Sequence, residues 1–391
     1  MKIYPVSDEK DWKAFHRVPH RIYANDPHWI CPPESDLRSI FDPSKNKTFG
    51  RGEAALFVLE DAQGSPAGRI AAFIDHARNE KQEVPTGGIG FFECTENGEY
   101  AAALFEAAES WLAGRGIKAV EGPVNFGERE RYWGLLVKGF YPPLFQEPYH
   151  PRYYEGLFRK NGYQPYEQIL TFKGEVANVP VEKFRRVAAV SAKRYGLHAE
   201  FFDMKRLDLM AQYFCQVYNR AFAKFEHHKH LGAEQMQSLF GEFKPIADKV
   251  STCMVYHGER PVGFCVLLPD INPFLRQSKG RMNGLALAWF MLRFKLARRK
   301  SLKGIAFGID PDFQGRGVFP VMIYQLCNDA LFRRYPQYYL AGIRGHNRIM
   351  VDSILNLGVG IDRVHVAFRK MLDERLELNP FPFVEVPGLS P

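Results

Sequence analysis

The chain repeats one arrangement of predicted elements, because the order found in its first half returns in its second half. Residues 54–75 and residues 251–272 each read as two strands joined by a polar turn that contains a glycine. In both halves a strand, a turn and a helix follow, and then a short strand that ends at Asn125 or at Asn347. Each half closes with a helix, a glycine and a last strand. A duplication of this kind predicts two similar units rather than one large core.

The length and composition agree with two units of ordinary size. A chain of 391 residues is long for a single hydrophobic core, and its 46% hydrophobic and 25% charged residues are ordinary values for a globular protein. We expect a first unit over residues 1–176, a connecting helix over residues 177–196 and a second unit over residues 197–391, with an insert at 271–303.

The six cysteines are scattered, and neither a C-x-x-C pair nor a histidine spacing suggests a zinc site. We therefore expect no metal and a reduced, cytoplasmic setting. Residues 1–20 lack the apolar centre of a signal peptide, and no apolar run reaches the roughly 18 residues that a spanning helix needs. These observations predict a protein that is neither secreted nor transmembrane.

The segment 304–331 reads as a buried strand, a tight turn and a helix. The first N–H groups of a helix lack partners inside it and carry the positive end of its dipole, so a diphosphate can bind there. A P-loop is excluded because no G-K-[ST] follows, and a plain glycine-rich turn is the alternative interpretation. The residues that we expect to hold the anion are Gln314, Gly315, Arg316, Gly317, Val318 and Phe319.

This turn resembles the Q-x-x-G-x-G/A motif with which the GNAT (Gcn5-related) acyl-CoA N-acyltransferases hold the pyrophosphate of coenzyme A. Gln314 and Gly317 match the motif, whereas Phe319 replaces its final glycine or alanine. The resemblance implies an α+β fold with two tandem GNAT-like domains, each a mixed, mainly antiparallel twisted sheet flanked by helices. It also implies acyl-CoA as the co-substrate and no metal.

Two further sets of residues follow from the same resemblance. In GNAT enzymes a backbone N–H on the strand before the turn polarises the thioester carbonyl, and the matching residues here are Phe307, Gly308 and Ile309. An asparagine after the next strand bonds the pantetheine arm, which makes Asn347 a cofactor residue; its alternative role is the N-cap of a helix.

The first half has no such turn at the matching place. Residues 94–99 read Cys-Thr-Glu-Asn-Gly-Glu, and the carboxylates of Glu96 and Glu99 would repel a diphosphate. We therefore expect only the second half to bind acyl-CoA. The first half has instead gained an insertion at 126–150, rich in aromatic residues and without obvious elements, which is either functional or a cover over the domain interface.

Acyl transfer to an amine needs a base, because an ammonium group must lose its proton before it attacks the thioester. The candidates, each of which could instead have an ordinary structural role, are Asp310, His346, Glu147 and Tyr149. A further cluster follows an apolar helix, where GNAT acceptor-binding segments lie, and consists of Glu226, His227, His228 and His230. Many GNAT enzymes protonate the leaving thiolate with a tyrosine on the last helix, but Ile354 and Phe158 occupy the two matching places.

The insert at 271–303 carries nine basic residues and no acidic one, which alone accounts for the formal net charge of +8. Residues 285–292 form an apolar run within it. A helix here would place Leu285, Trp289, Leu292 and Leu296 on one stripe, which favours contact with an anionic membrane surface through residues 281–300. The protein would then be peripheral at the inner face of the cytoplasmic membrane. The alternative is a helix that packs between the domains.

Three segments, residues 21–49, 122–126 and 153–163, also resemble a bacterial double-GNAT family that includes the bacterial ceramide synthases. That resemblance implies transfer of a long acyl group to an amphiphilic amine, such as a sphingoid base. Two alternatives stay open: an aminoacyl-tRNA-dependent transferase, in which the basic insert would bind RNA phosphates with steep salt dependence, and a non-catalytic acyl-CoA-binding protein. The intact glycine turn favours coenzyme A, so no nucleic-acid partner is expected.

Overall fold

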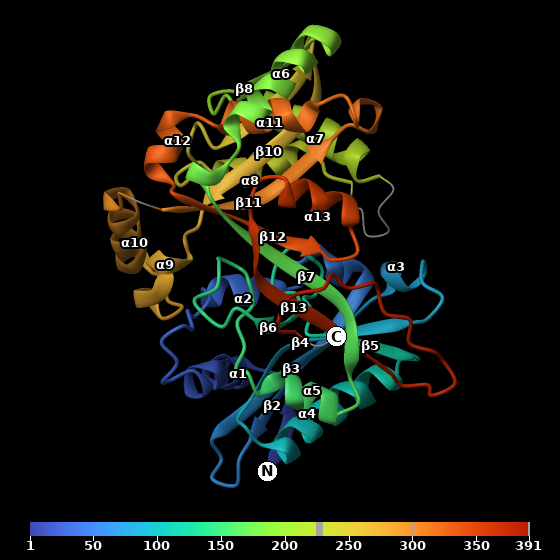
Figure 1. Ribbon diagram of the computed structural model, residues 1–391. Helices are drawn as coiled ribbons and strands as arrows, with labels where there is room; N and C mark the ends of the chain where they lie inside the picture. The colour runs from blue at the N-terminus through green and yellow to red at the C-terminus, as the bar shows by residue number, and fades with distance from the viewer. Residues whose placement is uncertain (224–229, 299, 390–391) are drawn as a thin grey trace.

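The computed structural model describes residues 1–223, 230–298 and 300–389 as an elongated molecule with one sheet running along its length (Figure 1). The strands are β1 (Lys2–Pro5), β2 (Gly52–Glu60), β3 (Pro66–Asp75), β4 (Thr86–Cys94), β5 (Ala119–Gly122), β6 (Leu135–Lys138), β7 (Gln164–Glu175), β8 (Leu197–Phe201), β9 (Thr252–His257), β10 (Arg260–Pro269), β11 (Ser301–Ile309), β12 (Gln337–Arg344) and β13 (Gly360–Met371). The helices are α1 (Glu9–Ile22), α2 (Glu34–Ile40), α3 (His76–Asn79), α4 (Gly98–Ala113), α5 (Tyr154–Lys160), α6 (Val181–Tyr195), α7 (Leu207–Ala221), α8 (Ala233–Phe243), α9 (Asn272–Leu275), α10 (Gly284–Leu296), α11 (Val318–Leu326), α12 (Asp329–Arg334) and α13 (Arg348–Leu355).

The sheet is mixed and mainly antiparallel. Its strands lie in the order β1-β2-β3-β4-β5-β13-β7-β12-β11-β10-β9-β8, and β6 pairs with β13 beside this path. Only β4 with β5 and β11 with β12 run parallel among the described strands. The parallel pair therefore occurs once in each half, at the matching place. This arrangement confirms both the predicted α+β class and the duplication.

Helices cover both faces of each half of the sheet. Neighbouring residues of a strand point to opposite faces, and where both are apolar each face needs a covering layer. In β3, Ile70 packs in one cluster with Leu104 of α4, whereas Ala71 packs in another with Leu37 of α2. In β10, a Cβ at Gly263 would meet the Val318 side chain of α11 at 2.6 Å, so α11 approaches the strand closely. The other face of β10 is covered by α7 and α8.

The last strand of each half lies in the middle of the sheet, next to the other half. β13 pairs with β5 of the first half, and β7 pairs with β12 of the second half (Figure 1). β7 and β13 then pair with each other, from Gly360 opposite Lys173 to Arg369 opposite Gln164. The two halves thus exchange their closing strands and share one core. The division at residues 176 and 196 remains a proposal, with α6 inside the expected connecting segment.

The insertion at 126–150 is structured, which corrects the expectation that it has no elements of its own. It contains β6, and it joins the two halves through backbone groups. The N–H of Phe145 donates to Asp270 Oδ1 at 2.9 Å, and the carbonyl of Phe145 accepts a hydrogen bond from Lys303. β6 was missed because four residues are too few to show a period.

A buried histidine at the end of this insertion makes the fold sensitive to acid. The Nδ1 atom of His150 accepts the Leu136 N–H at 3.1 Å, and burial, with a smaller effect of His365, lowers the pKa of His150 from 6.5 to about 3. The unfolded chain binds this proton below pH 6.5, so the stability that the neutral ring contributes is lost as the pH falls from 6.5 toward 3.

Between pH 6.5 and pH 5, we expect the lowered pKa of His150 to reduce the free energy of unfolding by about 2 kcal/mol. Urea denaturation at both pH values measures this loss. His150→Leu should have a smaller loss over the same interval, whatever its stability at neutral pH. His28→Leu, at an exposed histidine, is the control and should keep the wild-type slope. An unchanged slope in His150→Leu would contradict the assignment.

Candidate active site

The two parallel strands of the second half separate partway along their length. β11 pairs with β12 from Ser301 opposite Gln337 to Gly304 opposite Leu340 and no further. At Gly342, where φ is 74°, a bulge shifts the register of β12 against β7 and turns the strand away. On its other edge β11 stays paired with β10 as far as Ile309. The β12-facing edge of residues 305–309 therefore has no neighbouring strand in the described part of the chain.

The glycine turn follows directly after this open edge. Gly315 has φ 75° and Gly317 has φ 82°, values that other residues rarely adopt. Gly317 is the N-cap of α11, and no described residue accepts a hydrogen bond from the N–H groups of Gly315, Gly317, Val318 or Phe319. These outward N–H groups, at the positive end of α11, form an anion cradle.

Two neighbours define the shape of this cradle. The guanidinium of Arg316 is exposed and lies 5.1 Å from the ring of Phe313, so a cation stands beside the free N–H groups. Phe319, where the motif has a small residue, packs edge-on against Phe307 of β11 and Phe184 of α6, with ring centroids 5.5 and 6.2 Å away. The large side chain therefore fills space between the turn, β11 and α6.

The matching turn of the first half is closed by its own side chain. Asn97 is the N-cap of α4, and its Oδ1 accepts the N–H of Tyr100 at 3.0 Å. Glu96 and Glu99 lie beside this cap, and none of residues 94–99 is a glycine with a positive φ. Of these two turns, the one in the second half has the positive-φ glycines and the outward N–H groups, and binding of acyl-CoA there stays a prediction.

Asn347 adopts the structural role that the sequence analysis gave as its alternative. It is the N-cap of α13, and its Oδ1 accepts the Met350 N–H at 3.2 Å. It also follows β12 within three residues, so it stands at the end of the strand that borders the open edge of β11. A contact with the pantetheine arm stays a prediction.

Asp310 follows the last residue of β11 but is fully engaged by cations. Its Oδ2 lies 2.9 Å from Arg220 Nε and 2.8 Å from Arg260 Nη2, and its Oδ1 accepts the Asp312 N–H. Burial alone would raise the pKa of Asp310, but the two guanidinium groups and the N–H hold it below its usual value. A carboxylate held in this way is a poor proton acceptor, and its geometry favours a structural tie between α7, β10 and the turn.

His346 has the properties of a base. It lies two residues beyond β12, its side chain is 30% exposed, and its ring stacks on Phe381 with centroids 4.3 Å apart. Nδ1 is 3.7 Å from Glu167 Oε1. Burial lowers the pKa of His346 more than Glu167 raises it, and Arg344 and Arg129 add smaller lowering effects. The imidazole is therefore neutral near pH 7 and can accept a proton.

Glu147 and Tyr149 lie apart from the turn. The Glu147 side chain is 6% exposed, with Oε2 paired to Arg363 at 2.6 Å and Oε1 accepting from Thr171 at 2.6 Å. Burial lowers the pKa of Lys303, and Glu147 opposes that effect with a smaller one that raises it. Burial would raise the pKa of Glu147, but Arg363 holds it at about 2. The hydroxyl of Tyr149 donates to Asp26 Oδ2 at 2.8 Å, in the first half. Neither residue is brought to the open edge of β11.

The structure describes only one residue of the remaining candidate cluster. Glu226, His227 and His228 lie outside the described residues, and His230 is exposed. Of the four base candidates from the sequence, His346 alone combines a neutral ring, partial exposure and a place just after β12.

No family model matches the chain. It is 26% identical over 380 residues to a bacterial ceramide synthase from Caulobacter vibrioides, covering 95% of this chain and 98% of the relative. It is also 25% identical over 351 residues to Protein YghO from Escherichia coli, covering 84% of each chain.

Among solved structures, a tandem GNAT protein from the clavulanic acid biosynthesis pathway superposes with a TM-score of 0.54 at 9% identity, over 95% of this chain and 98% of that one. The chain has the tandem GNAT fold. A GCN5-related glucosamine N-acetyltransferase region of a fungal multi-domain protein gives a TM-score of 0.52 at 13% identity, over 94% of this chain and 38% of that one.

The position of the usual GNAT tyrosine is part of the core in both halves. Ile354 of α13 and Phe158 of α5 are buried, so neither place presents a side chain to a thiolate. The leaving group must receive its proton from another residue or from solvent, as the sequence already indicated.

Sequence reasoning missed a charged network beneath His346. Glu167 of β7 is buried and pairs with Arg129 at 2.6 Å and Arg344 at 3.3 Å, besides its contact with His346. Both guanidinium groups also lie over the ring of Trp133. A glutamate in the middle of an apolar strand was the available signal, because a buried carboxylate needs cationic partners. Its partners come from distant segments and could not be read from the pattern.

Proposed function

We propose that the chain is an acyl-CoA-dependent N-acyltransferase that joins a long acyl group to a long-chain amine at a membrane surface. The observation that carries this proposal is the cradle of free N–H groups at α11, directly after the open edge of β11. A diphosphate on the cradle would direct the rest of the coenzyme A arm along β12 toward residues 305–309. The first half, with its closed turn, would serve as a scaffold.

The proposed reaction uses few groups. A backbone N–H among Phe307, Gly308 and Ile309 would donate to the thioester oxygen as negative charge develops there. His346 would take the proton of the ammonium group, so that the neutral nitrogen attacks the carbonyl carbon. The new C–N bond forms, the nitrogen releases its second proton to solvent, the C–S bond breaks, and the thiolate takes a proton from solvent. Arg344 and Arg129 favour the neutral form of His346 before the reaction, and Glu167 would stabilise the imidazolium that forms.

The exposed apolar face of α10 supports an amphiphilic amine as the acceptor. This helix projects from the body beside α9 (Figure 1), and only Phe290 and Phe294 of it are buried. Leu285 is 85% exposed, Trp289 54% and Leu296 71%. None of the helices in the described segments is both long and apolar enough to cross a bilayer. An apolar helix that leaves this face outside the protein is suited to lie in the plane of a membrane interface.

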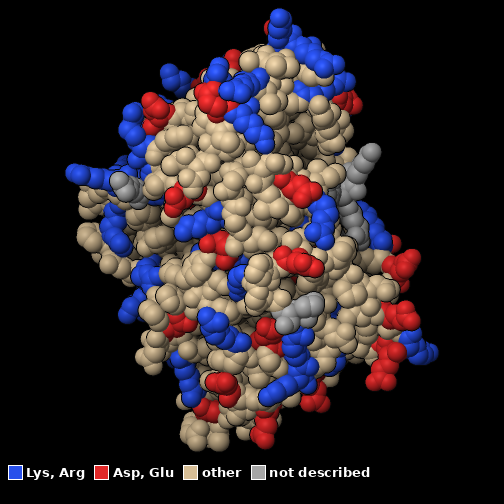
Figure 2. Space-filling view, viewed as in Figure 1, with Lys and Arg blue, Asp and Glu red and all other residues tan. Residues whose placement is uncertain are grey.

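Charge around α10 favours an anionic membrane. The side of the molecule that carries α10, on the left in Figure 2, shows uncharged surface bordered by lysine and arginine. Arg281, Arg293, Lys295 and Arg298 stand before, on and after the helix. Each cation near an anionic surface adds roughly 1 kcal/mol to binding. We propose that α10 holds the enzyme at the inner face of the cytoplasmic membrane.

A largely apolar cavity of about 350 Å³ lies where α10 meets the body. Phe145, Ile271, Leu275, Met282 and Phe290 supply its apolar wall, and Pro33, Ser35 and Asp36 complete it. Phe145 belongs to the insertion that contacts Lys303, near the beginning of β11. We propose that a hydrocarbon chain leaves the membrane beneath α10 through this cavity. A sphingoid base, with an amine at one end of such a chain, fits this path, and the name of the Caulobacter relative supports the same choice.

The function is tested with the purified chain, palmitoyl-CoA and sphinganine, by thiol release and by mass spectrometry of the amide product. We expect amide formation that depends on both substrates and is slower with acetyl-CoA. Product formed only with aminoacyl-tRNA would favour the tRNA-dependent alternative instead. Binding of acyl-CoA without thiol release to any long-chain amine would indicate a non-catalytic binding protein.

The role of α10 is tested by Leu285→Gln, Leu292→Gln and Leu296→Gln combined in one variant. All three side chains are outside the core, so the fold should keep its melting temperature. Binding to vesicles of phosphatidylglycerol should weaken by at least roughly 10-fold, because the apolar surface that would enter the interface is removed. Val190→Gln, at an exposed valine of α6, is the matched control. Vesicle binding within about twofold of wild type would contradict the proposal.

A further inference from the structure

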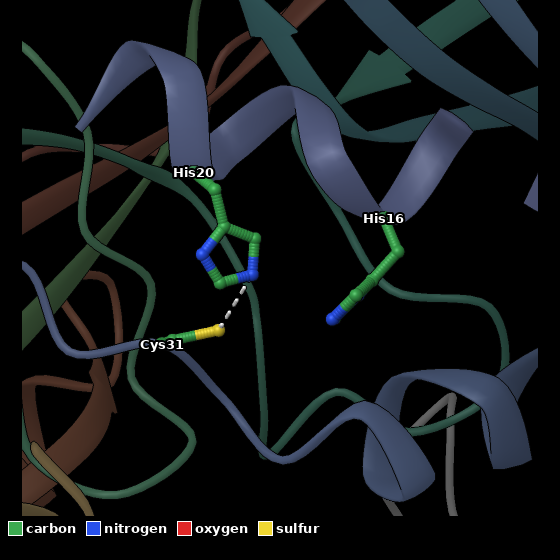
Figure 3. Close-up of side chains that lie close together, drawn as sticks. All are labelled: His16, His20 and Cys31. Carbon is green, nitrogen blue, oxygen red and sulfur yellow. Dashed lines mark hydrogen bonds between the residues drawn. The ribbon is translucent and has the colours of Figure 1, made fainter. Parts of the chain in front are cut away.

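Three side chains that commonly bind metals meet in the first half, apart from the acyl-transfer site (Figure 3). His16 and His20 lie one turn apart on α1, and Cys31 comes from the segment that precedes α2. One ligand atom of each lies within 4.8 Å of the others, and Cys31 Sγ is 3.6 Å from His20 Nε2. Histidines at i and i+4 of a helix present their rings on the same face, which is a common arrangement in zinc sites.

The distances are close to those of a tetrahedral zinc site. Bonds of about 2.0 Å to nitrogen and about 2.3 Å to sulfur place neighbouring ligand atoms roughly 3.3–3.8 Å apart. The pair His20 and Cys31 already has this separation, and the longest separation in the cluster must close by only about 1 Å. Glu34 lies outside this group of three but next to it, because its Oε2 is 3.7 Å from His16 Nε2, and its Oε1 accepts a hydrogen bond from Trp12 Nε1 at 3.3 Å. A small movement of its carboxylate would supply a fourth ligand.

A ring nitrogen of the cluster also lacks a partner, because the Nδ1 atom of His16 is buried without a hydrogen bond in the described structure. A metal would displace the proton of the Cys31 thiol as it binds.

Arg281, Lys279 and above all Arg69 oppose a cation at this place, but other groups offset the charge of Arg69. Its guanidinium lies 3.7 Å from Glu93 Oε1 and donates to the Phe15 carbonyl at 3.2 Å. A thiolate at Cys31 would further compensate for Arg69. We propose that His16, His20 and Cys31, joined by Glu34, bind one zinc ion with a structural role.

The proposed ion would stabilise the segment on which the insert with α10 rests. The N–H of Glu34 donates to the Gly280 carbonyl at 2.9 Å, and a Cβ at Gly280 would meet Cys31 Sγ at 2.7 Å. The insert therefore rests directly on the segment that carries two of the ligands. A zinc ion here would hold this segment against α1 and so fix the base from which α10 projects.

The test uses the full-length chain, treated with a chelator, dialysed and then titrated with zinc by calorimetry, with metal content measured by mass spectrometry. We expect about one zinc per chain and, at zinc well above its dissociation constant, a melting temperature about 4 °C higher. His20→Ala and Cys31→Ser should lose at least roughly 10-fold in zinc affinity. His28→Ala and Cys327→Ser, outside the cluster, are the matched controls and should bind as wild type does.

Cobalt gives a second measurement that needs no variant. In the wild-type chain a thiolate-to-cobalt charge-transfer band should appear in the near ultraviolet as cobalt is added and disappear as zinc displaces it. Zinc uptake below about 0.1 equivalents, uptake unchanged in both ligand variants, or cobalt binding without the thiolate band would each overturn the proposal.

Discussion

Gly315→Val should weaken the binding of coenzyme A about 100-fold, or about 2.7 kcal/mol. Gly315 has φ 75°, which a β-branched residue adopts only with strain, and the space around its missing Cβ is open. The valine would therefore push the turn out of shape and place its methyl groups where we expect the diphosphate. Calorimetry with coenzyme A measures the loss.

The first half provides a matched control. Gly98 is the first residue of α4, directly after the matching turn, also with open space around its Cβ but without a positive φ. Gly98→Val should leave coenzyme A binding unchanged, and both variants should keep cooperative thermal unfolding. If Gly98→Val lost as much affinity as Gly315→Val, the cofactor site would be in the wrong half. If neither lost affinity, the cradle would not be the site.

His346→Gln should lower kcat for amide formation by roughly 100-fold to 10,000-fold, with the KM for acyl-CoA changed little. Glutamine keeps hydrogen bonding but cannot take the proton of the ammonium group. In the wild type, kcat/KM should fall as the pH drops through the lowered pKa of His346, because the protonated ring is not a base. This acid limb, measured from pH 5 to 8, should be absent in the variant.

Variants of two carboxylates test whether His346 acts as the base or has only a structural role. Asp310→Asn and Glu147→Gln each remove a charge that faces buried or clustered arginines, so both should lower the melting temperature. We expect both variants to keep the acid limb of the wild type. If Asp310→Asn abolished that limb while His346→Gln retained it, the base would be Asp310 and the assignment here would be wrong.

The sequence predicted the features that depend on local pattern. The glycine turn at residues 314–319 and the exposed stripe of the helix near residue 289 each rest on the pattern of one short segment, and each has a direct physical cause: the positive φ of a glycine or the period of a helix. The duplication was visible because the same order of local patterns occurs in both halves.

Other features depend on contacts between distant residues and could not be read from one chain. Each half offers nearly the same strand edge for β7 and for β13, so the pattern of the sequence does not show which edge either strand pairs with. Glu167 finds Arg129 and Arg344 only after that exchange has placed β7 beside β12. The spacing of His16 and His20 was present in the sequence, but the ligand that completes the group, Cys31, is brought to them by a loop.

The exchanged strands also bear on how the protein is made. A ribosome releases the first half with the place beside β5 still vacant, because the strand that fills it, residues 360–371, follows the other described strands in the chain. That edge of the nascent sheet must stay exposed, or be shielded by a chaperone, until residues 360–371 emerge. Completion of both halves is therefore one event that waits for this strand, and a stop codon shortly before Gly360 would leave the amino-terminal part unfinished even though every residue of it is present.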